Sequence, residues 1–137
     1  MNVHKYKRSK QRDKILNILQ KTDTHPTASW IYDELKKEFN YLSMGTVYRN
    51  LTILIDQHLI KKIEAGSNFD RYDSNTEPHY HFICRKCGSV FDLPIELIEN
   101  LDQKANLASD FQVETHEVKF FGICNYCLKN KDKKEAN

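Results

Sequence analysis

The sequence predicts an α+β fold in two small domains, and three observations lead to this prediction. The first half carries three amphipathic helical segments followed by two short strand-like segments. At Glu77 and Pro78, aromatic and β-branched residues begin to alternate with polar ones. Two Cys-x-x-Cys pairs occur, both in the second half. We therefore expect one domain over residues 1–76 and a second over residues 77–137.

The composition is that of a small globular protein. The chain has 137 residues, of which 39% are hydrophobic and 29% charged, and this length excludes a large catalytic barrel. No apolar run is long enough to span a bilayer, and the N-terminus lacks an apolar signal core. We therefore expect a cytoplasmic protein without a membrane partner, in which disulfides are not expected.

The first two helical segments are predicted from apolar stripes. The stripe of the first helix is Ile15, Leu16, Ile18 and Leu19, and that of the second is Ala28, Trp30, Ile31, Leu35 and Phe39. Thr27, behind Pro26, is the expected N-cap of the second helix because its hydroxyl can accept a hydrogen bond from the first turn. Two amphipathic helices in sequence predict a helical core.

The third helical segment, residues 42–60, has two different faces. Ser43 is its expected N-cap, and one side carries Val47, Leu51, Leu54 and His58. The opposite side carries Gly45, Arg49 and Thr52, flanked by Thr46 and Tyr48. This second face is small, polar and cationic, so it is suited to contact with a polyanion.

Two strands, within residues 59–65 and 69–73, are expected to follow this helix, with a tight turn at residues 66–68. Three helices and a hairpin form the order of a winged helix, in which the third helix enters the major groove of DNA. The expected DNA-contacting residues are Thr46, Tyr48 and Arg49 at the bases, and Lys61, Lys62, Lys10 and Arg12 at the phosphates. A helical core with an unrelated hairpin is the alternative.

A basic cluster precedes Thr22. It comprises Lys5, Lys7, Arg8, Lys10, Arg12, Lys14 and Lys21, against the single acid Asp13. Such a cluster is either a solvated arm or a surface that attracts phosphates.

The two cysteine pairs are Cys84/Cys87 and Cys124/Cys127. Each pair places two thiolates on a tight turn, and together they complete the tetrahedral four-sulfur shell that is typical of structural zinc. A redox-active pair is the competing interpretation, but it leaves the second pair unexplained. The 36 residues between the pairs are expected to contain a helix and a strand.

The remaining elements of the second half follow from its patterning. We expect strands over residues 79–84 and 89–93, an amphipathic helix over 95–108 and a long strand over 111–124.

A second group of metal-capable residues lies outside the cysteine pairs. The candidates are His25, Asp73, His79, His81 and Asp92. His79 and His81, two apart on a strand, project to one face, and Asp92 can lie beside them on the next strand. Three imidazoles and two carboxylates suit Fe(II) or Mn(II) better than a closed zinc site. Ordinary surface or hydrogen-bonded core histidines are the alternative.

Five ordered segments carry a recognisable pattern over nearly the whole chain: HPTASWIYDELKKEF, SMGTVYRNLTIL, RYD, HYHFICRKCG and GICNYC. They resemble the ferric uptake regulator family of metal-dependent repressors, and most of all its peroxide-responsive branch. The resemblance implies an N-terminal winged-helix DNA-binding domain and a C-terminal α/β dimerisation domain with a Cys₄ zinc. It also implies a homodimer on double-stranded operator DNA.

The same resemblance assigns the regulatory metal to His25, Asp73, His79, His81 and Asp92, and implies that iron-catalysed oxidation of His25 or His79 releases DNA. An iron- or manganese-level sensor with the same ligands is the alternative function. A further metal site of the family retains only Glu99 and His116 here. No HExxH-type arrangement is present, and so we expect a binding protein, not a zinc hydrolase.

Overall fold

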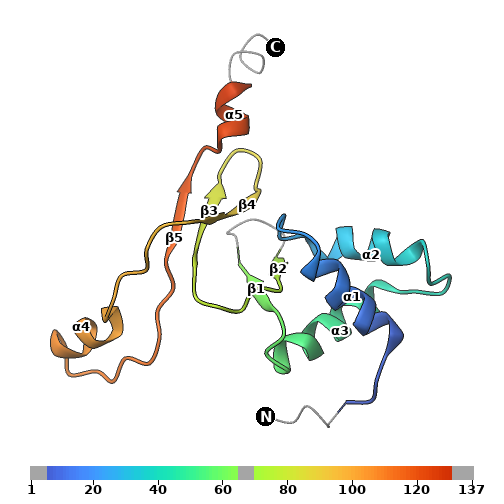
Figure 1. Ribbon diagram of the computed structural model, residues 1–137, viewed down its shortest axis with the longest axis horizontal. Helices are drawn as coiled ribbons and strands as arrows, with labels where there is room; N and C mark the ends of the chain where they lie inside the picture. The colour runs from blue at the N-terminus through green and yellow to red at the C-terminus, as the bar shows by residue number, and fades with distance from the viewer. Residues whose placement is uncertain (1–5, 65–69, 131–137) are drawn as a thin grey trace. The chain divides into compact units, whose positions relative to one another are not determined.

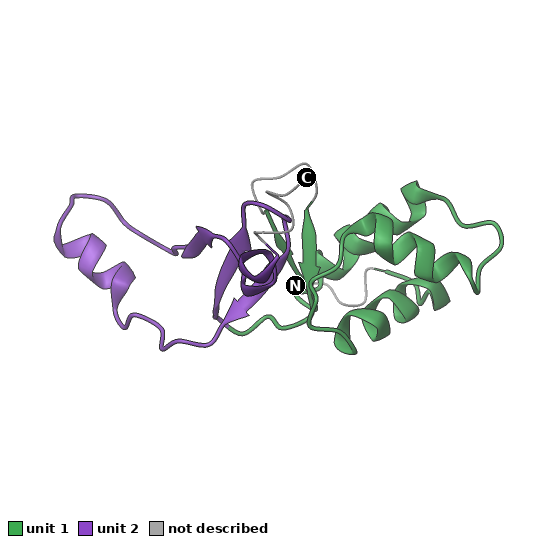
Figure 2. Cartoon of the chain, turned by 90° about the horizontal axis from the view of Figure 1, so that it is seen from above, with its two compact units in different colours: residues 1–77 green, residues 78–137 purple. Residues whose placement is uncertain are grey.

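The computed structural model describes residues 6–64 and 70–130. The chain divides into two compact units, residues 1–77 and residues 78–137 (Figure 2). The first unit is mainly helical, and the second is built on a three-stranded sheet (Figure 1). The turn expected at residues 66–68 lies outside the described residues. Within residues 6–64 and 70–130, no helix has the length and apolarity needed to cross a membrane.

Unit 1 contains α1 (Lys10–Gln20), α2 (Ala28–Lys36) and α3 (Met44–Asp56). Each helix begins with a hydroxyl cap that accepts a hydrogen bond from a backbone N–H of the first turn, and the capping residues are Ser9, Thr27 and Ser43. The caps predicted at Thr27 and Ser43 are therefore confirmed.

The core of unit 1 collects the apolar faces of all three helices and the hairpin. Its fully buried members include Ile15, Leu19, Ile31, Leu35, Val47, Leu51, Leu54 and Ile60. Burying each such side chain is worth about 1.5–3 kcal/mol. The packing of α3 against α1 and α2 therefore fixes which of its faces remains exposed.

His58 does not continue the side of α3 that carries Val47, Leu51 and Leu54, although helical spacing aligned it with them. The helix ends at Asp56, and His58 adopts a left-handed backbone with φ 61°. In that conformation the N–H groups of His58 and Leu59 bind the carbonyls of Ile55 and Leu54 at 2.9 and 3.0 Å, which closes the helix end. The imidazole is therefore exposed.

The hairpin consists of β1 (Lys61–Ile63) and β2 (Arg71–Asp73), paired antiparallel with Lys61 opposite Asp73. It is also attached to the loop before α2, because the Tyr72 N–H donates to the Pro26 carbonyl at 3.0 Å and Thr27 forms a bridge with Arg71. The hairpin is thus part of the helical unit, as a winged helix requires, and the alternative of an unrelated hairpin is excluded.

Unit 2 contains β3 (Tyr80–Cys84), β4 (Val90–Leu93), α4 (Leu101–Leu107), β5 (Lys119–Gly122) and α5 (Asn125–Lys129). The sheet order is β4-β3-β5, with β3 antiparallel to β4 and parallel to β5. The register places His81 opposite Asp92 and Cys84 opposite Gly122. The side chains of His81, Cys84 and Asp92 are therefore positioned by one small sheet.

Two predicted elements of unit 2 are shorter than expected. The helix expected over residues 95–108 covers only Leu101–Leu107, after Asn100 in a left-handed backbone conformation with φ 59°. The strand expected over residues 111–124 covers only Lys119–Gly122. Since Lys119 is paired with His81, a longer β5 would run past the start of β3, where Pro78 has no N–H to donate.

Candidate metal centres

The four cysteine sulfurs converge at one end of the unit 2 sheet. Cys84 is the last residue of β3 and Cys87 lies in the turn that follows, whereas Cys124 is the N-cap of α5 and Cys127 lies within that helix. The Sγ–Sγ distances are 3.8 Å for Cys84–Cys127 and 3.8 Å for Cys87–Cys124, and all four ligand atoms lie within 4.8 Å of one another. A tetrahedral shell with Zn–S bonds of about 2.3 Å has sulfurs about 3.8 Å apart. The thiols therefore fit a zinc ion.

Backbone N–H groups support these sulfurs. The N–H groups of Cys87 and Cys124 both donate to Cys84 Sγ at 3.4 Å, and the N–H of Cys127 donates to Cys124 Sγ at 3.5 Å. Gly88 completes the first turn with φ 77°, a conformation that glycine adopts without steric cost. The two turns are thus built around the sulfur atoms.

The thiols differ in acidity. Burial alone would raise the pKa of Cys84, but N–H donors from Cys87, Cys124 and Lys86 outweigh it and lower the pKa to about 6. Burial, together with hydrogen bonds to the neighbouring sulfurs, raises the pKa of Cys127 to about 12. At neutral pH a bound cation is therefore needed to convert Cys127 to its thiolate, and a closed four-sulfur shell of this kind is structural.

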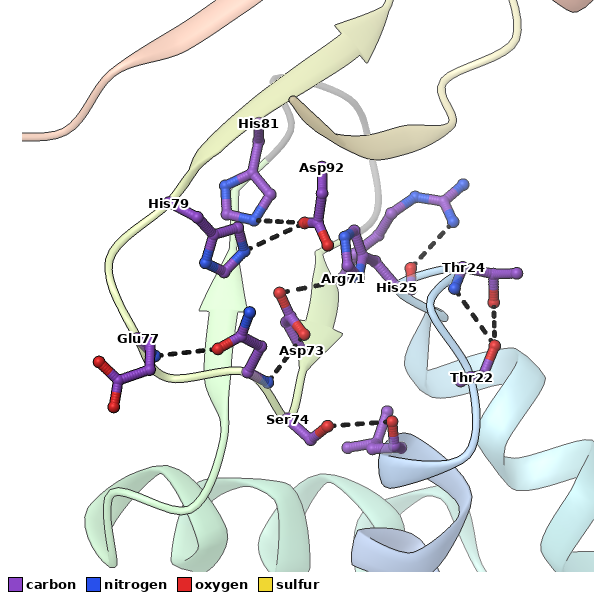
Figure 3. Close-up of polar contacts among 12 residues, drawn as sticks. Thr22, Thr24, His25, Arg71, Asp73, Ser74, Glu77, His79, His81 and Asp92 are labelled. Atoms are coloured by element: carbon purple, nitrogen blue, oxygen red, sulfur yellow. Dashed lines mark hydrogen bonds and ion pairs between the residues drawn. The ribbon is translucent and has the colours of Figure 1, made fainter. Parts of the chain in front are cut away.

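The five nitrogen and oxygen ligand candidates divide between the units. In unit 1, His25 Nδ1 lies 3.8 Å from Asp73 Oδ2, and the side chains are only 2% and 7% exposed (Figure 3). His25 has a left-handed backbone with φ 52°, which costs energy for a residue other than glycine. β2 holds it in place, because Arg71 donates to the His25 carbonyl at 3.1 Å.

In unit 2, Asp92 lies beside both histidines (Figure 3). Its Oδ1 atom is 3.0 Å from His79 Nε2 and 3.6 Å from His81 Nε2, and the two imidazole centroids are 4.4 Å apart. The β3–β4 register produces this grouping, since His81 and Asp92 are cross-strand partners. The common face predicted for His79 and His81 is therefore confirmed.

These distances suit divalent metal ligands. Two atoms bound to one ion at about 2.1 Å can be at most about 4.2 Å apart, and at right angles they are about 3.0 Å apart. The His25–Asp73 pair in unit 1 and the distances from Asp92 to His79 and to His81 in unit 2 satisfy this limit. A set of imidazoles and carboxylates without thiolates suits Fe(II) or Mn(II).

His116, one of two remaining candidates for a further family site, has a different partner. Its Nδ1 atom lies 2.6 Å from Asp102 Oδ1 on α4. Glu99 is exposed, just before α4.

The expected DNA-facing residues of α3 are accessible. Tyr48 is 50% exposed, Arg49 is exposed and Thr46 is half-buried, so the packing of α3 leaves the predicted face open. Among the expected phosphate contacts, Lys10 and Lys61 are exposed. Lys62 is 3.7 Å from Glu64 Oε1 and 3.8 Å from Asp70 Oδ2.

Arg12 differs from the exposed cation that we expected. It is buried, and its guanidinium donates to Asn50 Oδ1 at 3.2 Å and to the Lys7 carbonyl. Sequence reasoning missed Asn50 altogether. Helical spacing places Arg12 on the same stripe as Ile15 and Leu19, and this position could have indicated its burial.

Comparison with known proteins agrees with these observations. The model of the ferric uptake regulator family matches residues 4–121. The peroxide-responsive repressor of Staphylococcus epidermidis is 36% identical over 117 residues, which are 85% of this chain and 78% of the relative.

Two solved structures are also similar. The Campylobacter jejuni peroxide stress regulator has a TM-score of 0.71 at 31% identity, over 85% of this chain and 88% of that one. The Helicobacter pylori ferric uptake regulator, described with three functional metal-binding sites, has a TM-score of 0.77 at 28% identity, over 89% and 82%. From the sequence match, the fold and the two ligand sets, the chain belongs to the ferric uptake regulator family.

Proposed function

We propose that this protein is a metal-dependent, peroxide-responsive transcriptional repressor that binds operator DNA as a homodimer. The observation that carries the proposal is the division of the nitrogen and oxygen ligands between the two units. His25 and Asp73 belong to the winged-helix unit, whereas His79, His81 and Asp92 belong to the sheet unit.

A regulatory ion bound by both ligand groups would join the two units. Occupancy of the site would then select one relative orientation of the units from those available without metal. In a dimer, the orientation of the units sets the distance between the two copies of α3. That distance must match operator half-sites about one helical turn, or a multiple of it, apart. The metal would therefore act as a corepressor.

The exposed surface of unit 2 supports the homodimer. Four large apolar side chains of α4 and its connections are 43% to 82% exposed, and they are Leu97, Ile98, Leu107 and Phe111. β5 is an edge strand of the sheet, and its Phe120 and Phe121 are 39% and 46% exposed. Edge strands and exposed apolar patches are usually covered by another surface, and a second copy of unit 2 would cover both.

The sensing chemistry depends on which ion is bound. Fe(II) supplies one-electron chemistry with peroxide, whereas Mn(II) at the same ligands is much less reactive toward it. In the iron form, we expect an oxygen atom to be added to the imidazole of His25 or His79. The oxidised imidazole is a poorer ligand, and so the link between the units and the affinity for DNA would both be lost.

The test is operator binding with Fe(II), Mn(II) or Zn(II), before and after dilute peroxide. The operator is first selected from a random DNA pool with the Mn(II)-loaded protein. We expect peroxide to release DNA from the Fe(II) form alone, with added oxygen on His25 or His79 by mass spectrometry. Equal release from the Fe(II) and Mn(II) forms, or added mass on the cysteines only, would instead support an iron- or manganese-level sensor. Failure to select any DNA sequence with any metal would contradict the repressor function itself.

A further inference from the structure

The N-terminal arm, defined here as residues 6–9, is attached to α3 by side-chain hydrogen bonds. The Arg12 guanidinium, at the start of α1, donates both to the Lys7 carbonyl in the arm and to Asn50 Oδ1 on α3. The Tyr6 hydroxyl donates to Asp56 Oδ2 at the end of α3, at 2.8 Å. The arm is therefore anchored at two adjacent residues, Tyr6 and Lys7.

Burial makes the Arg12 contacts strong. Arg12 is 8% exposed and Asn50 is 6% exposed. A buried guanidinium must have hydrogen-bond partners, because an unpaired charge in the interior is costly. The planar fork of arginine can bind two acceptors at once, which the single ammonium of lysine does less well. With its guanidinium bound to two acceptors and only 8% of the residue exposed, Arg12 offers little surface to a DNA backbone.

The arm and the polar face of α3 border the same surface hollow. Its volume is about 380 Å³, and its lining includes Lys7, Arg8, Arg12, Thr46 and Arg49. Lys7 and Arg8 are exposed, like Arg49. The arm therefore places two cations next to the face of α3 that is predicted to contact bases.

We propose that Arg12 is a positioning residue for DNA binding, which holds the arm on α3 so that Lys7 and Arg8 contact phosphates beside the bases contacted by Arg49. This inference rests on the proposed DNA-binding function. It assigns to Arg12 an indirect role and gives the direct phosphate contacts to the arm.

The first test needs no DNA. Trypsin cleaves after Lys7 and Arg8, and intact-mass analysis of the zinc-loaded protein measures the rate. Arg12→Lys keeps the charge but loses the fork, and Asn50→Ala removes the acceptor on α3. We expect both variants to be cleaved at the arm several-fold faster than the parent, with Lys61→Ala unchanged as the matched control. Equal cleavage rates in all four proteins would overturn the proposal, whatever the protein does with DNA.

The second test is the salt dependence of operator affinity. Each phosphate contact contributes about 0.9 to the slope of log K against log salt. The double variant Lys7→Ala/Arg8→Ala should lower the slope by about 1.8. Arg12→Lys, although it removes no charge, should lower it by a similar amount, and combining all three changes should lower it no further. Lys61→Ala should lower the slope further when it is combined with either variant, because Lys61 is an expected phosphate contact outside the arm.

Two outcomes of the salt measurement contradict the positioning role. An unchanged slope in Arg12→Lys with normal affinity would mean that the arm does not depend on Arg12. An unchanged slope with lower affinity and a lower unfolding temperature would mean that Arg12 only stabilises unit 1. Should Arg12→Lys fail to fold, Asn50→Ala serves for the same comparison.

Discussion

The imidazole of His25 and the carboxylate of Asp73 lie together in the interior of unit 1, with Nδ1 and Oδ2 3.8 Å apart. His25 lies in the loop before α2, and Asp73 is the last residue of β2. The Tyr72 N–H donates a hydrogen bond to the Pro26 carbonyl, which attaches β2 to this loop. A buried, strained histidine beside a buried carboxylate is an expensive arrangement for a purely structural role. Such an arrangement is typical of a binding site.

Replacement of His25 by Asn should remove the regulatory metal and leave the zinc. Asn tolerates the left-handed backbone that His25 adopts, so the change removes the imidazole with little backbone strain. We expect one equivalent of zinc per chain, no second metal and loss of metal-dependent operator binding. His58→Asn is the matched control, because His58 is also left-handed but exposed. The ligand assignment is wrong if the two variants bind Mn(II) equally by calorimetry.

Asp92→Glu should separate metal binding from peroxide sensing. Glutamate keeps the charge but places the carboxylate one methylene further from its own backbone, which changes its position relative to His79 and His81. We expect metal-dependent DNA binding to persist while the peroxide concentration that releases DNA rises several-fold. Histidine oxidation in the Fe(II) form, followed by mass spectrometry, should decrease in parallel. Unchanged oxidation of His25 and His79 in this variant would show that Asp92 does not tune the reaction.

Cys87→Ser should abolish the zinc-dependent fold of unit 2 and the homodimer. Although Cys87 is the exposed member of the shell, three remaining thiolates cannot close it, and small metal-binding domains gain much of their folding free energy from the ion. Zinc content, sedimentation and thermal unfolding measure the outcome. A zinc-free protein that remained a stable dimer would exclude a structural role for the site.

Zinc binding should strengthen steeply with pH. The pKa of Cys127 is raised to about 12, so this thiol holds a proton that zinc must displace throughout the neutral range. The pKa of Cys84 is lowered to about 6, so its thiolate is lost as the pH falls through 6. We expect the apparent zinc affinity to rise about tenfold or more per pH unit between pH 7 and 9, because at least one proton is released. Competition with a chelator measures it, and a flat profile would contradict the proton assignment.

Arg49→Ala should reduce discrimination between operator and random DNA. A lost contact to base edges costs roughly 1–3 kcal/mol at particular positions. Lys61→Ala is the comparison, since loss of a phosphate contact weakens binding to all sequences alike. Binding is measured on the selected operator, its single-base variants and random DNA. If Arg49→Ala lowers the affinity for operator and for random DNA by the same factor, Arg49 does not recognise bases.

The sequence by itself determined the features that depend on local spacing. The two cysteine turns and the caps at Thr27 and Ser43 each involve residues three apart, and short-range geometry fixes such contacts. The order of three helices and a hairpin also follows from local periodicity. The family pattern could name His25 and Asp73 as ligands, but not their burial or their distance.

Only the tertiary structure decided the features that depend on contacts between distant segments. β5 is short because its ladder ends where β3 begins, and the pattern of residues 111–118 contains no information about that register. Arg12 is buried because Asn50 and the Lys7 carbonyl provide acceptors for its fork, whereas charge alone predicted an exposed phosphate contact. A charged side chain is buried or exposed according to the partners that the fold brings to it, and those partners lie elsewhere in the chain.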